Sequence, residues 1–432
     1  MSAADPFGAA DRELLRDLLL LPTVNPLESA EPPARMWQAQ RAYARAAESI
    51  GFRTVHHAAP DPAVLDRDDV PRAVRDAAGT ADFLAEQPNL VLRLGPDLPP
   101  ERTVMFNAHL DTVAGIEPVT CTAERITGRG SIDAKGPAVA LLAGIRTALD
   151  GIPALGRDIG VLVQIVSGEE GGAMGTCGTR PLVEAGFFGR LNVFCEPTGL
   201  RYLPRATASM TARIRVDGRG AIDDEPAAGH NATVLLGFLA QHLARHLDPR
   251  DRPGRCCVAG VRTGEQHNRV YGSGNLLLNL SYATAAEGAE AERALRAAVR
   301  SGLREFTEIF GRTREFARTA AHAAEIVHVD WLKRGLPCLD ASPAWARELF
   351  VAAGLARWPD ELPAFTCDAI WMHDVPGTAT VVLGPGSLET NHAHAEGEYA
   401  DVAELRDFAR AVASLLTEFT ERHHWGAGEE TT

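Results

Sequence analysis

A short apolar run that ends in a histidine and an aspartate constrains the fold of this chain more than any other feature. Residues 103–111 read Thr-Val-Met-Phe-Asn-Ala-His-Leu-Asp, and the β-branched and aromatic side chains before His109 predict a buried strand. Such a strand delivers His109 and Asp111 at its carboxyl end, where an imidazole can bind a metal and a carboxylate can fix its tautomer. For the motif taken alone, the alternative is a solvated histidine beside a turn aspartate.

Strands alternate with helices after that run. Apolar strands are predicted at 159–166 and 191–195, and an apolar helix is predicted at 136–149. Near the end of the chain, a helix at 343–353 is followed by a strand at 379–383. This alternation predicts an α/β fold in which a mainly parallel sheet is covered by helices.

The sequence pattern changes near residue 206 and changes back near residue 320. Residues 208–216 alternate apolar and polar side chains, as a half-exposed strand does, and predicted helices follow at 231–246 and 288–310. Because a chain of 432 residues is too long for one ordinary core, we expect a discontinuous α/β domain that contains a small α+β insert. The expected boundaries are 1–205 and 319–432 for the α/β domain and 206–318 for the insert.

Charge and cysteine content exclude several classes of protein. The formal net charge is −14, with 57 acidic and 43 basic residues, so a phosphate backbone would be repelled and no nucleic acid is expected as a partner. The 7 cysteines are scattered and include no Cys-x-x-Cys pair, which excludes a disulfide framework and a cysteine zinc site. The apolar run 18–21 is too short for a signal or membrane segment. We therefore expect a cytoplasmic protein that does not contact a membrane.

Acidic residues and histidines recur directly after predicted strands or in glycine-rich turns. In an open α/β sheet such positions converge on the crevice beyond the strand ends. Carboxylates packed together repel one another unless cations neutralise them, and imidazoles beside them complete a nitrogen and oxygen ligand set. A two-metal hydrolytic centre needs a bridging carboxylate, one imidazole and one further carboxylate per metal, and a free carboxylate as base. The positions that supply this inventory are His109, Asp111, Asp133, Glu169, Glu170, Glu196, His392 and His394.

Each of these acids also has a plain structural alternative. Glu169 and Glu170 can form a solvated turn, and Asp133 can be an Asx-turn residue in a glycine-rich loop. Glu196 can cap the segment that follows Pro197. The order of the motifs along the chain therefore carries more weight than any one of them.

Five motifs, in order, resemble those of the M20 metallopeptidases, the family of acetylornithine deacetylase, succinyl-diaminopimelate desuccinylase, the aminoacylases and the glutamate-releasing carboxypeptidases. The family's His-x-Asp-Thr-Val motif is similar to residues 109–113, and its Gly-Arg-Gly-Ser-x-Asp-x-Lys-Gly motif is similar to residues 128–136. Its pair of glutamates, its Glu-Pro-Thr segment and its closing Gly-Pro-Gly…His-x-x-x-Glu-Tyr pattern look like residues 169–170, 196–198 and 384–399. The resemblance covers nearly the whole chain.

The resemblance implies a discontinuous zinc-hydrolase catalytic domain with an inserted lid and dimerisation domain. Two zinc ions are implied as cofactors, with Co²⁺ or Mn²⁺ as substitutes. Asp133 would bridge the two ions, and the peptide bond after Asp133 would be cis. Glu169 would be the general base that takes a proton from the attacking water and returns it to the leaving amine, and Asp111 would orient His109. The implied metal ligands are His109, Asp133, Glu170, Glu196 and His394.

The implied reaction is cleavage of an amide bond in an N-acyl amino acid or a small peptide-like compound. The implied assembly is a homodimer formed through the lid. His392 remains an alternative to His394, because His392 keeps the family's distance from the Gly-Pro-Gly and His394 keeps its distance to the Glu-Tyr. The local Ala-His wording favours His394.

The lid departs from the family at two places. Ile222 stands where the family has a histidine that donates to the scissile carbonyl, and an aliphatic side chain cannot donate a hydrogen bond. Ser281 stands where relatives commonly carry an arginine for the substrate carboxylate, and a serine cannot form a bidentate ion pair. These departures keep a second function open: a non-standard reaction, such as ester hydrolysis or condensation, or a non-catalytic metal-binding partner. The candidate substrate-binding residues of the lid are His230, His267, Asn268 and Arg269.

Overall fold

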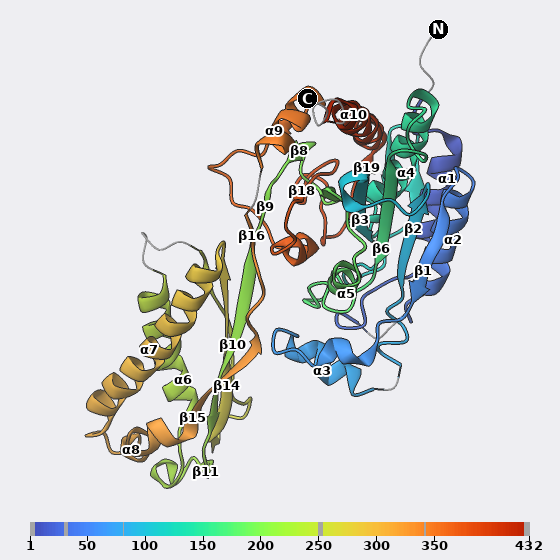
Figure 1. Ribbon diagram of the computed structural model, residues 1–432. Coiled ribbons are helices and arrows are strands. Elements are labelled where there is room, and N and C mark those ends of the chain that lie inside the picture. The colour runs from blue at the N-terminus through green and yellow to red at the C-terminus, as the bar shows by residue number, and fades with distance from the viewer. Residues whose placement is uncertain (1–4, 30–32, 81, 249–253, 341–342, 427–432) are drawn as a thin grey trace. The chain divides into compact units, whose positions relative to one another are not determined.

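The structure is a computed structural model that describes residues 5–29, 33–80, 82–248, 254–340 and 343–426. The chain divides into two compact units (Figure 1). The first unit comprises Met1–Arg67, Ala73–Ala206 and Leu339–Thr432, and the second comprises Asp68–Arg72 and Thr207–Cys338.

A six-stranded sheet with the order β1-β2-β6-β3-β7-β18 lies at the centre of the first unit (Figure 1). Only β2 within this sheet runs antiparallel to its neighbours, so the predicted, mainly parallel α/β fold is confirmed. Every residue of β3 and of β6 is buried, which is why their sequences are mainly apolar rather than alternating. The strands are β1 (Arg53–Ala58), β2 (Asn89–Leu94), β3 (Thr103–His109), β6 (Gly160–Val166), β7 (Leu191–Phe194) and β18 (Ala379–Val382).

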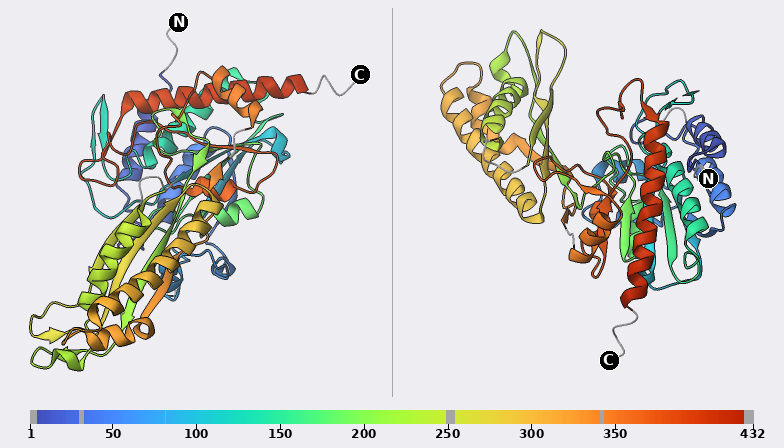
Figure 2. Two further views of the ribbon diagram at one scale, coloured as in Figure 1. Left: turned by 90° about the vertical axis from the view of Figure 1, so that its left-hand side faces the viewer. Right: turned by 90° about the horizontal axis from the view of Figure 1, so that it is seen from above.

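Helix α4 (Lys135–Gly151) packs against α1 (Ala9–Leu19) and α10 (Val402–Gly426) (Figures 1 and 2). Apolar side chains of these helices and of the sheet form one core cluster. Gly144 allows α4 to approach α10 closely, because a Cβ there would lie 2.6 Å from the carbonyl oxygen of Ala409. Further helices are α2 (Met36–Glu48), α3 (Arg72–Ala78), α5 (Thr179–Glu184) and α9 (Ala344–Ala352), with 3₁₀ turns η1 (Pro62–Leu65), η2 (Pro100–Arg102) and η4 (Asp368–Met372).

Short strands tie the ends of the inserted segment together. Strand β9 (Arg205–Ala206) pairs antiparallel with β16 (Leu339–Asp340), so the chain leaves the first unit and returns to it at one place. Other short pairings join β8 (Arg201–Tyr202) to β17 (Ala356–Arg357), and join β19 (Tyr399–Asp401) to β5 (Arg125–Thr127) and β4 (Thr120–Cys121).

The second unit is an α+β insert built on an antiparallel sheet with the order β12-β14-β10-β15. Every second residue of β10 is buried along most of the strand, and the same holds for β14, as the alternating sequence pattern predicts. Helices α6 and α7 pack against each other and against β14. The elements are β10 (Ala208–Asp217), β11 (Ala221–Ile222), η3 (Pro226–Ala228), α6 (Ala232–Leu247), β12 (Cys256–Arg262), β13 (Arg269–Val270), β14 (Ser273–Tyr282), α7 (Ala285–Phe310), α8 (Ala317–Ile326) and β15 (Val327–Lys333).

The second unit extends further along the chain than the predicted boundary at 318. Helix α8 packs against α7, and β15 forms an edge of the sheet by pairing antiparallel with β10. The chain therefore returns to the first unit at Leu339 rather than at residue 319. Strand β15 is mostly half-buried, and a strand of this kind leaves no strong apolar pattern in the sequence.

Candidate metal centre

Three neighbouring parallel strands deliver side chains to one edge of the first unit's sheet. His109 is the last residue of β3, Glu169 and Glu170 follow β6, and Glu196 follows β7. Because β3 pairs in parallel with both β6 and β7, their carboxyl ends lie at the same edge. Asp133 joins them from the turn before α4. This is the edge at which open α/β sheets bind ligands.

One group of side chains gathers around His109. Its Nε2 lies 3.0 Å from Asp133 Oδ1 and 3.7 Å from Glu196 Oε1, and all three residues are buried. Two ligand atoms bound tetrahedrally to one zinc lie about 3.4 Å apart, since each is roughly 2.1 Å from the ion. The observed separations bracket that value, so these three atoms can hold one cation.

A second group gathers around His394, which belongs to the segment of the chain that joins β18 to β19. Its Nε2 lies 2.9 Å from Asp133 Oδ2 and 2.9 Å from Glu170 Oε1. The two oxygens of Asp133 thus face two different imidazoles, one from each group. Among the described residues, His394 rather than His392 belongs to a group that could hold a metal ion.

A backbone carbonyl fixes the tautomer of His109. Its Nδ1 lies 2.9 Å from the carbonyl oxygen of Asp111, whereas the Asp111 carboxylate is 3.7 Å away. Because a carbonyl can only accept, Nδ1 carries a proton, and Nε2 is the ring nitrogen left to bind a cation beside Asp133 and Glu196. The Asp111 carboxylate instead accepts from Asn25 Nδ2 at 2.9 Å and from the Glu170 backbone N–H at 3.0 Å. The Asp111 carboxylate therefore also helps to fix the position of the loop after β6, which carries Glu170.

The electrostatics of the centre are those of crowded carboxylates. Burial raises the pKa of Glu169 well above its usual value, and it raises the pKa of Glu170 to about 7. The pKa of Glu196 is also raised by burial. Contacts with the carboxylates of Asp133 and Glu170 raise the pKa of His394 to about 10. Burial therefore disfavours the charged form of the three glutamates, whereas the neighbouring carboxylates favour the charged form of His394.

The donor set fits two divalent cations. Five carboxylates (Asp111, Asp133, Glu169, Glu170 and Glu196) surround two imidazoles, and such an excess of buried negative charge needs cations. Within the described part of the chain, Asp111 Oδ1 is buried and accepts no hydrogen bond, and the buried Glu170 Oε1 faces the His394 imidazole at 2.9 Å. Nitrogen and carboxylate oxygen atoms are ligands that zinc takes readily, and Asp133 supplies an oxygen to each group.

Glu398 supports the turn that carries Asp133. One of its carboxylate oxygens accepts the backbone N–H groups of Gly130, Ile132 and Asp133 at 3.0, 3.1 and 3.3 Å. The other lies 2.7 Å from Arg129 Nη1. The peptide bond after Asp133 is cis, as the resemblance implied. Glu398 had no predicted role, although its place in the closing Glu-Tyr pattern was a signal.

Lys135 and Asn25 also support the centre without belonging to it. The Lys135 ammonium is buried and donates to the carbonyl oxygens of Leu18 and Leu21, both at 3.1 Å. Burial lowers the pKa of Lys135 to about 7. Asn25 donates to the carbonyl oxygen of Glu170 as well as to Asp111. Sequence reasoning missed Asn25, because its partners lie far away in the chain.

The predicted substrate-binding residues lie in the second unit. Both ring nitrogens of His230 are engaged there: Nδ1 accepts the Arg219 N–H at 2.8 Å, and Nε2 lies 2.9 Å from His322 Nδ1. Burial lowers the pKa of His230. His267, Asn268 and Arg269 are exposed, and Arg269 pairs in register with Ile222, which is 57% exposed. Any contact of these side chains with a substrate stays a prediction.

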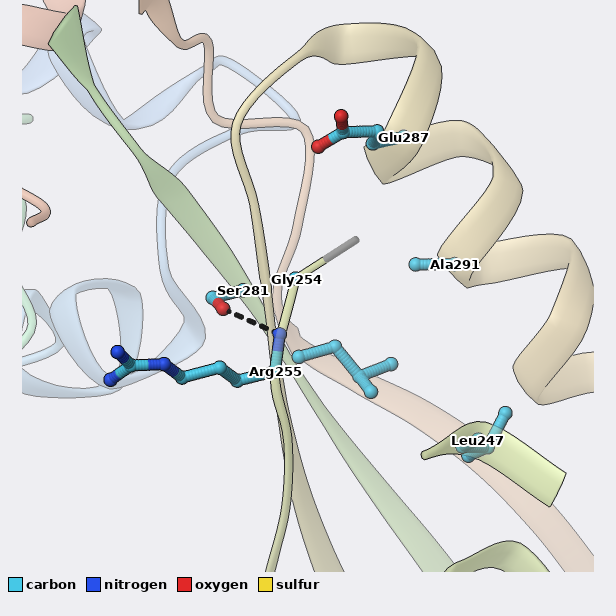
Figure 3. Close-up of a pocket in the computed structure, with 7 residues that line it drawn as sticks. Leu247, Gly254, Arg255, Ser281, Glu287 and Ala291 are labelled. Atoms are coloured by element: carbon cyan, nitrogen blue, oxygen red, sulfur yellow. Dashed lines mark hydrogen bonds between the residues drawn. The ribbon is translucent and has the colours of Figure 1, made fainter. Parts of the chain in front are cut away.

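Ser281 has a local structural partner. Its hydroxyl oxygen accepts the backbone N–H of Arg255 at 2.9 Å, in a small pocket that Leu247 and Glu287 also line (Figure 3). The Ser281 N–H in turn donates to the Arg255 carbonyl oxygen at 3.0 Å. Ser281 therefore ties the chain just before β12 to β14.

The helices in the described ranges contain no stretch that is both long and apolar enough to cross a membrane. The fold and the clustered ligands define an α/β protein with an inserted α+β unit and a candidate metal centre. The chain belongs to peptidase family M20/M25/M40, whose family model matches residues 105–418. The resemblance noted in the sequence is thereby confirmed, and a metal-dependent hydrolase, as predicted, is the enzyme class of this family.

Two curated relatives share part of the sequence. A protein of Aeropyrum pernix named "Putative [LysW]-lysine/[LysW]-ornithine hydrolase" is 29% identical over 200 residues, which cover 45% of this chain and 51% of that protein. A protein of the same name from Pyrobaculum aerophilum is 31% identical over 170 residues, which cover 39% of this chain and 47% of that protein. The chain thus spans about half the length of the curated relatives it matches.

Solved structures share the fold across almost the whole chain. The M20 family metallo-carboxypeptidase Sso-CP2 of Sulfolobus solfataricus aligns with a TM-score of 0.67 at 12% identity, covering 95% of this chain and 99% of the other. The aminopeptidase PepT of Bacillus cereus gives a TM-score of 0.64 at 17% identity, with 94% and 97% covered. The YXEP protein of Bacillus subtilis, described as a dinuclear metal-binding peptidase, gives 0.59 at 12% identity, with 96% and 99% covered.

Proposed function

We propose that the protein hydrolyses an amide bond with the help of two divalent cations held between His109 and His394. The observation that carries this proposal is the Asp133 carboxylate, whose Oδ1 lies 3.0 Å from one imidazole nitrogen and whose Oδ2 lies 2.9 Å from the other. A carboxylate shared in this way is the bridging group of two-metal hydrolytic centres. Glu196 and Glu170 provide one terminal carboxylate on each side.

Zinc is the proposed metal, with Co²⁺ or Mn²⁺ as substitutes, because the donors are imidazole nitrogens and carboxylate oxygens. When bound, the two cations would polarise the scissile carbonyl and lower the pKa of the attacking water. The protein holds the ligands in place through the Glu398 carboxylate under the Asp133 turn and through the Asp111 carbonyl on His109. It therefore supplies a fixed ligand set rather than one that assembles around the substrate.

Glu169 is the proposed general base. It lies next to Glu170 and shares a group with His109, yet it belongs to neither of the two groups that include Asp133. Burial raises the pKa of Glu169, and a carboxylate with a raised pKa can take a proton from the attacking water and hold it until the amine leaves. Returning that proton to the amine nitrogen completes the hydrolysis.

An N-acyl amino acid or a small peptide-like compound is the proposed substrate. The names of the curated relatives add amides of lysine and ornithine to the compounds worth testing. A homodimer through the second unit is also proposed, since β12 is an edge strand with mostly exposed residues, and such an edge can pair with a second copy. Light scattering on the eluting protein would measure that assembly.

A second function follows from the lid. Ile222 is exposed but apolar, and Ser281 is uncharged and already accepts the Arg255 N–H, so these positions supply neither an imidazole donor nor a guanidinium for an acyl amino acid. With such a lid the centre could act on an ester, run a condensation, or bind metal without turnover. A panel of esters beside the amides separates these outcomes.

The experiment that tests the proposed function is Glu169→Gln, measured together with metal content. We expect two zinc equivalents per chain, about the wild-type value, and a loss of hydrolysis of roughly 100-fold or more, because the variant keeps both ligand groups but cannot accept the proton. Retained turnover would remove Glu169 from its role. A wild-type protein that binds no zinc, or that binds zinc but hydrolyses no amide, would overturn the proposed function.

A further inference from the structure

A buried carboxyl group outside the ligand set connects three elements that surround the centre. Asp368 begins η4 and is 1% exposed. Its Oδ2 accepts the hydroxyl of Thr179, the first residue of α5, at 2.6 Å. That hydroxyl accepts in turn from Asn107 Nδ2 at 2.9 Å, and Asn107 lies in β3 two residues before His109. The chain of bonds reaches β6 through Gln164, whose Oε1 is 2.7 Å from the same amide nitrogen.

The segment that ends just before Thr179 is the 167–178 loop, which joins β6 to α5 and carries Glu169 and Glu170. The loop folds back on itself through a hydrogen bond from the Gly175 N–H to the Gly168 carbonyl oxygen at 2.8 Å. Side chains of Asp111 and Asn25 anchor its backbone at Glu170, and Asn89 anchors it at Cys177. The residues between these anchors pass through a run of turns rather than a helix or strand. The geometry of both glutamates therefore depends on what packs against this loop.

The 3₁₀ turn η4 packs against this loop at two points. At the first, Gly175 has a φ of 59° and lies directly on the Asp368 carboxyl group, where a Cβ would collide with both oxygens. At the second, Trp371 Nε1 donates to the Met174 carbonyl oxygen at 2.6 Å. Since α5 and η4 also contact each other, η4 holds the loop from its middle to its end.

Asp368 also has one free oxygen within the described residues. Its Oδ1 is buried and accepts no hydrogen bond there. Burial raises the pKa of Asp368 to about 8. The negative charges of Asp111 and Glu196 also raise this pKa, whereas the His109 imidazole lowers it. Burying a carboxyl group with only one oxygen hydrogen-bonded costs folding free energy. Such a group near the centre therefore calls for a functional explanation.

We propose that Asp368 is a positioning residue, whose carboxyl group ties η4 to the 167–178 loop and thereby sets the place of Glu169 beside the metal ligands. The inference rests on the base role proposed above for Glu169. Asp368 would touch neither substrate nor metal. It acts through the bond to Thr179 and through its contact with Gly175.

Three variants separate this role from a general effect on stability. Asp368→Ala removes the carboxyl group, and Asp368→Asn keeps an oxygen that can accept from Thr179. Asp374→Asn is the matched control, because Asp374 follows η4 closely but is exposed and contacts only His373 among the ion pairs of the described residues. If Asp368→Ala does not fold, Thr179→Val removes the donor of the same bond while keeping the side chain's volume.

Hydrogen–deuterium exchange of the zinc-loaded protein measures the loop directly and needs no substrate. Asp368→Ala should raise exchange of the 168–178 amides by about tenfold, with β3 and β6 unchanged, and Asp368→Asn should restore most of the protection. With a substrate that the wild-type protein hydrolyses, kcat should fall by about tenfold or more in Asp368→Ala, while KM and zinc content stay near the wild-type values. The control should match the wild type in every measurement.

Two results would overturn the proposal. Unchanged loop exchange in both Asp368→Ala and Thr179→Val would show that the bond does not hold the loop. Equal defects in Asp368→Asn and Asp368→Ala would show that the accepting oxygen is not what matters. If the exchange responds as expected but the wild type hydrolyses nothing, the positioning of the loop stands and the proposed function fails.

Discussion

Replacing Glu398 by glutamine should weaken the metal centre although no ligand is changed. Glu398 is 1% exposed, and one of its oxygens accepts the N–H groups of Gly130, Ile132 and Asp133. Its other oxygen pairs with Arg129 at 2.7 Å. A glutamine keeps an acceptor for the three N–H groups but leaves the guanidinium without its buried counter-charge.

The magnitude follows from what remains around Arg129. Removing one partner of a buried ion pair typically costs roughly 3–5 kcal/mol. Glu117 remains 3.7 Å from Arg129 Nη2, and the Ala395 carbonyl oxygen still accepts from it at 3.0 Å, so part of the compensation is kept. We therefore expect the free energy of unfolding of the metal-free protein to fall by about 2–3 kcal/mol. Because Asp133 is shared by both ligand groups, zinc affinity should fall by roughly 10- to 100-fold.

Urea unfolding of the metal-free protein and competition with a zinc chelator measure the two effects separately. Glu396→Gln is the matched control, since Glu396 lies two residues away in the same loop and is exposed. We expect the control to match the wild type in both assays. A Glu398→Gln protein with wild-type zinc affinity would refute the reasoning that the Asp133 turn depends on this carboxylate.

Two further predictions concern the choice of ligand and the pH dependence of the second unit. His394→Ala should lower the zinc content from about two to about one equivalent per chain, whereas His392→Ala should leave it unchanged, as metal analysis would show; the reverse result would make His392 the ligand. For Asp330, burial raises the pKa, but hydrogen bonds from Arg213 and Arg215 outweigh burial and lower it overall. A carboxyl group with a lowered folded-state pKa adds stability that is fully present above its unfolded value of about 3.9 and is lost as the pH falls through the lowered value. Asp330→Asn should thus be destabilised at pH 7 and lose less stability than the wild type on acidification below about pH 4, and equal pH profiles in urea unfolding would contradict this.

The sheet and the clustering of the candidate ligands were predictable because both rest on strong local patterns. The mainly apolar runs of β3 and β6 favoured buried strands, and in a parallel sheet neighbouring carboxyl ends lie at the same edge. That geometry brings His109 near Glu169 and Glu170 without any knowledge of contacts. Glycine-rich turns before an apolar helix likewise singled out Asp133.

The residues that support the centre were not predictable in the same way. Glu398, Asn25 and Asp368 are buried polar side chains, and their partners are groups in distant segments. A residue of this kind has no periodicity, and in the sequence it looks like any surface acid or amide. The role of Asp111 was incompletely predicted for a related reason: its backbone carbonyl, which every residue has, is the group that bonds to His109.

The two departures from the family, at Ile222 and Ser281 of the second unit, are physically different, and this difference decides which one can be tested alone. Sequence reasoning could see that Ser281 lacks a positive charge, but it could not see that the hydroxyl accepts the Arg255 N–H at the start of β12. An arginine at 281 would remove that acceptor, so the substitution would change the lid structure together with its charge. Ile222 is 57% exposed and lies in the short strand β11, so a histidine there adds a donor at little structural cost. A gain of amide hydrolysis in Ile222→His alone would therefore be attributable to the added donor. An unchanged activity in Ser281→Arg would not tell whether the added charge has no effect or whether the lost hydrogen bond offsets it.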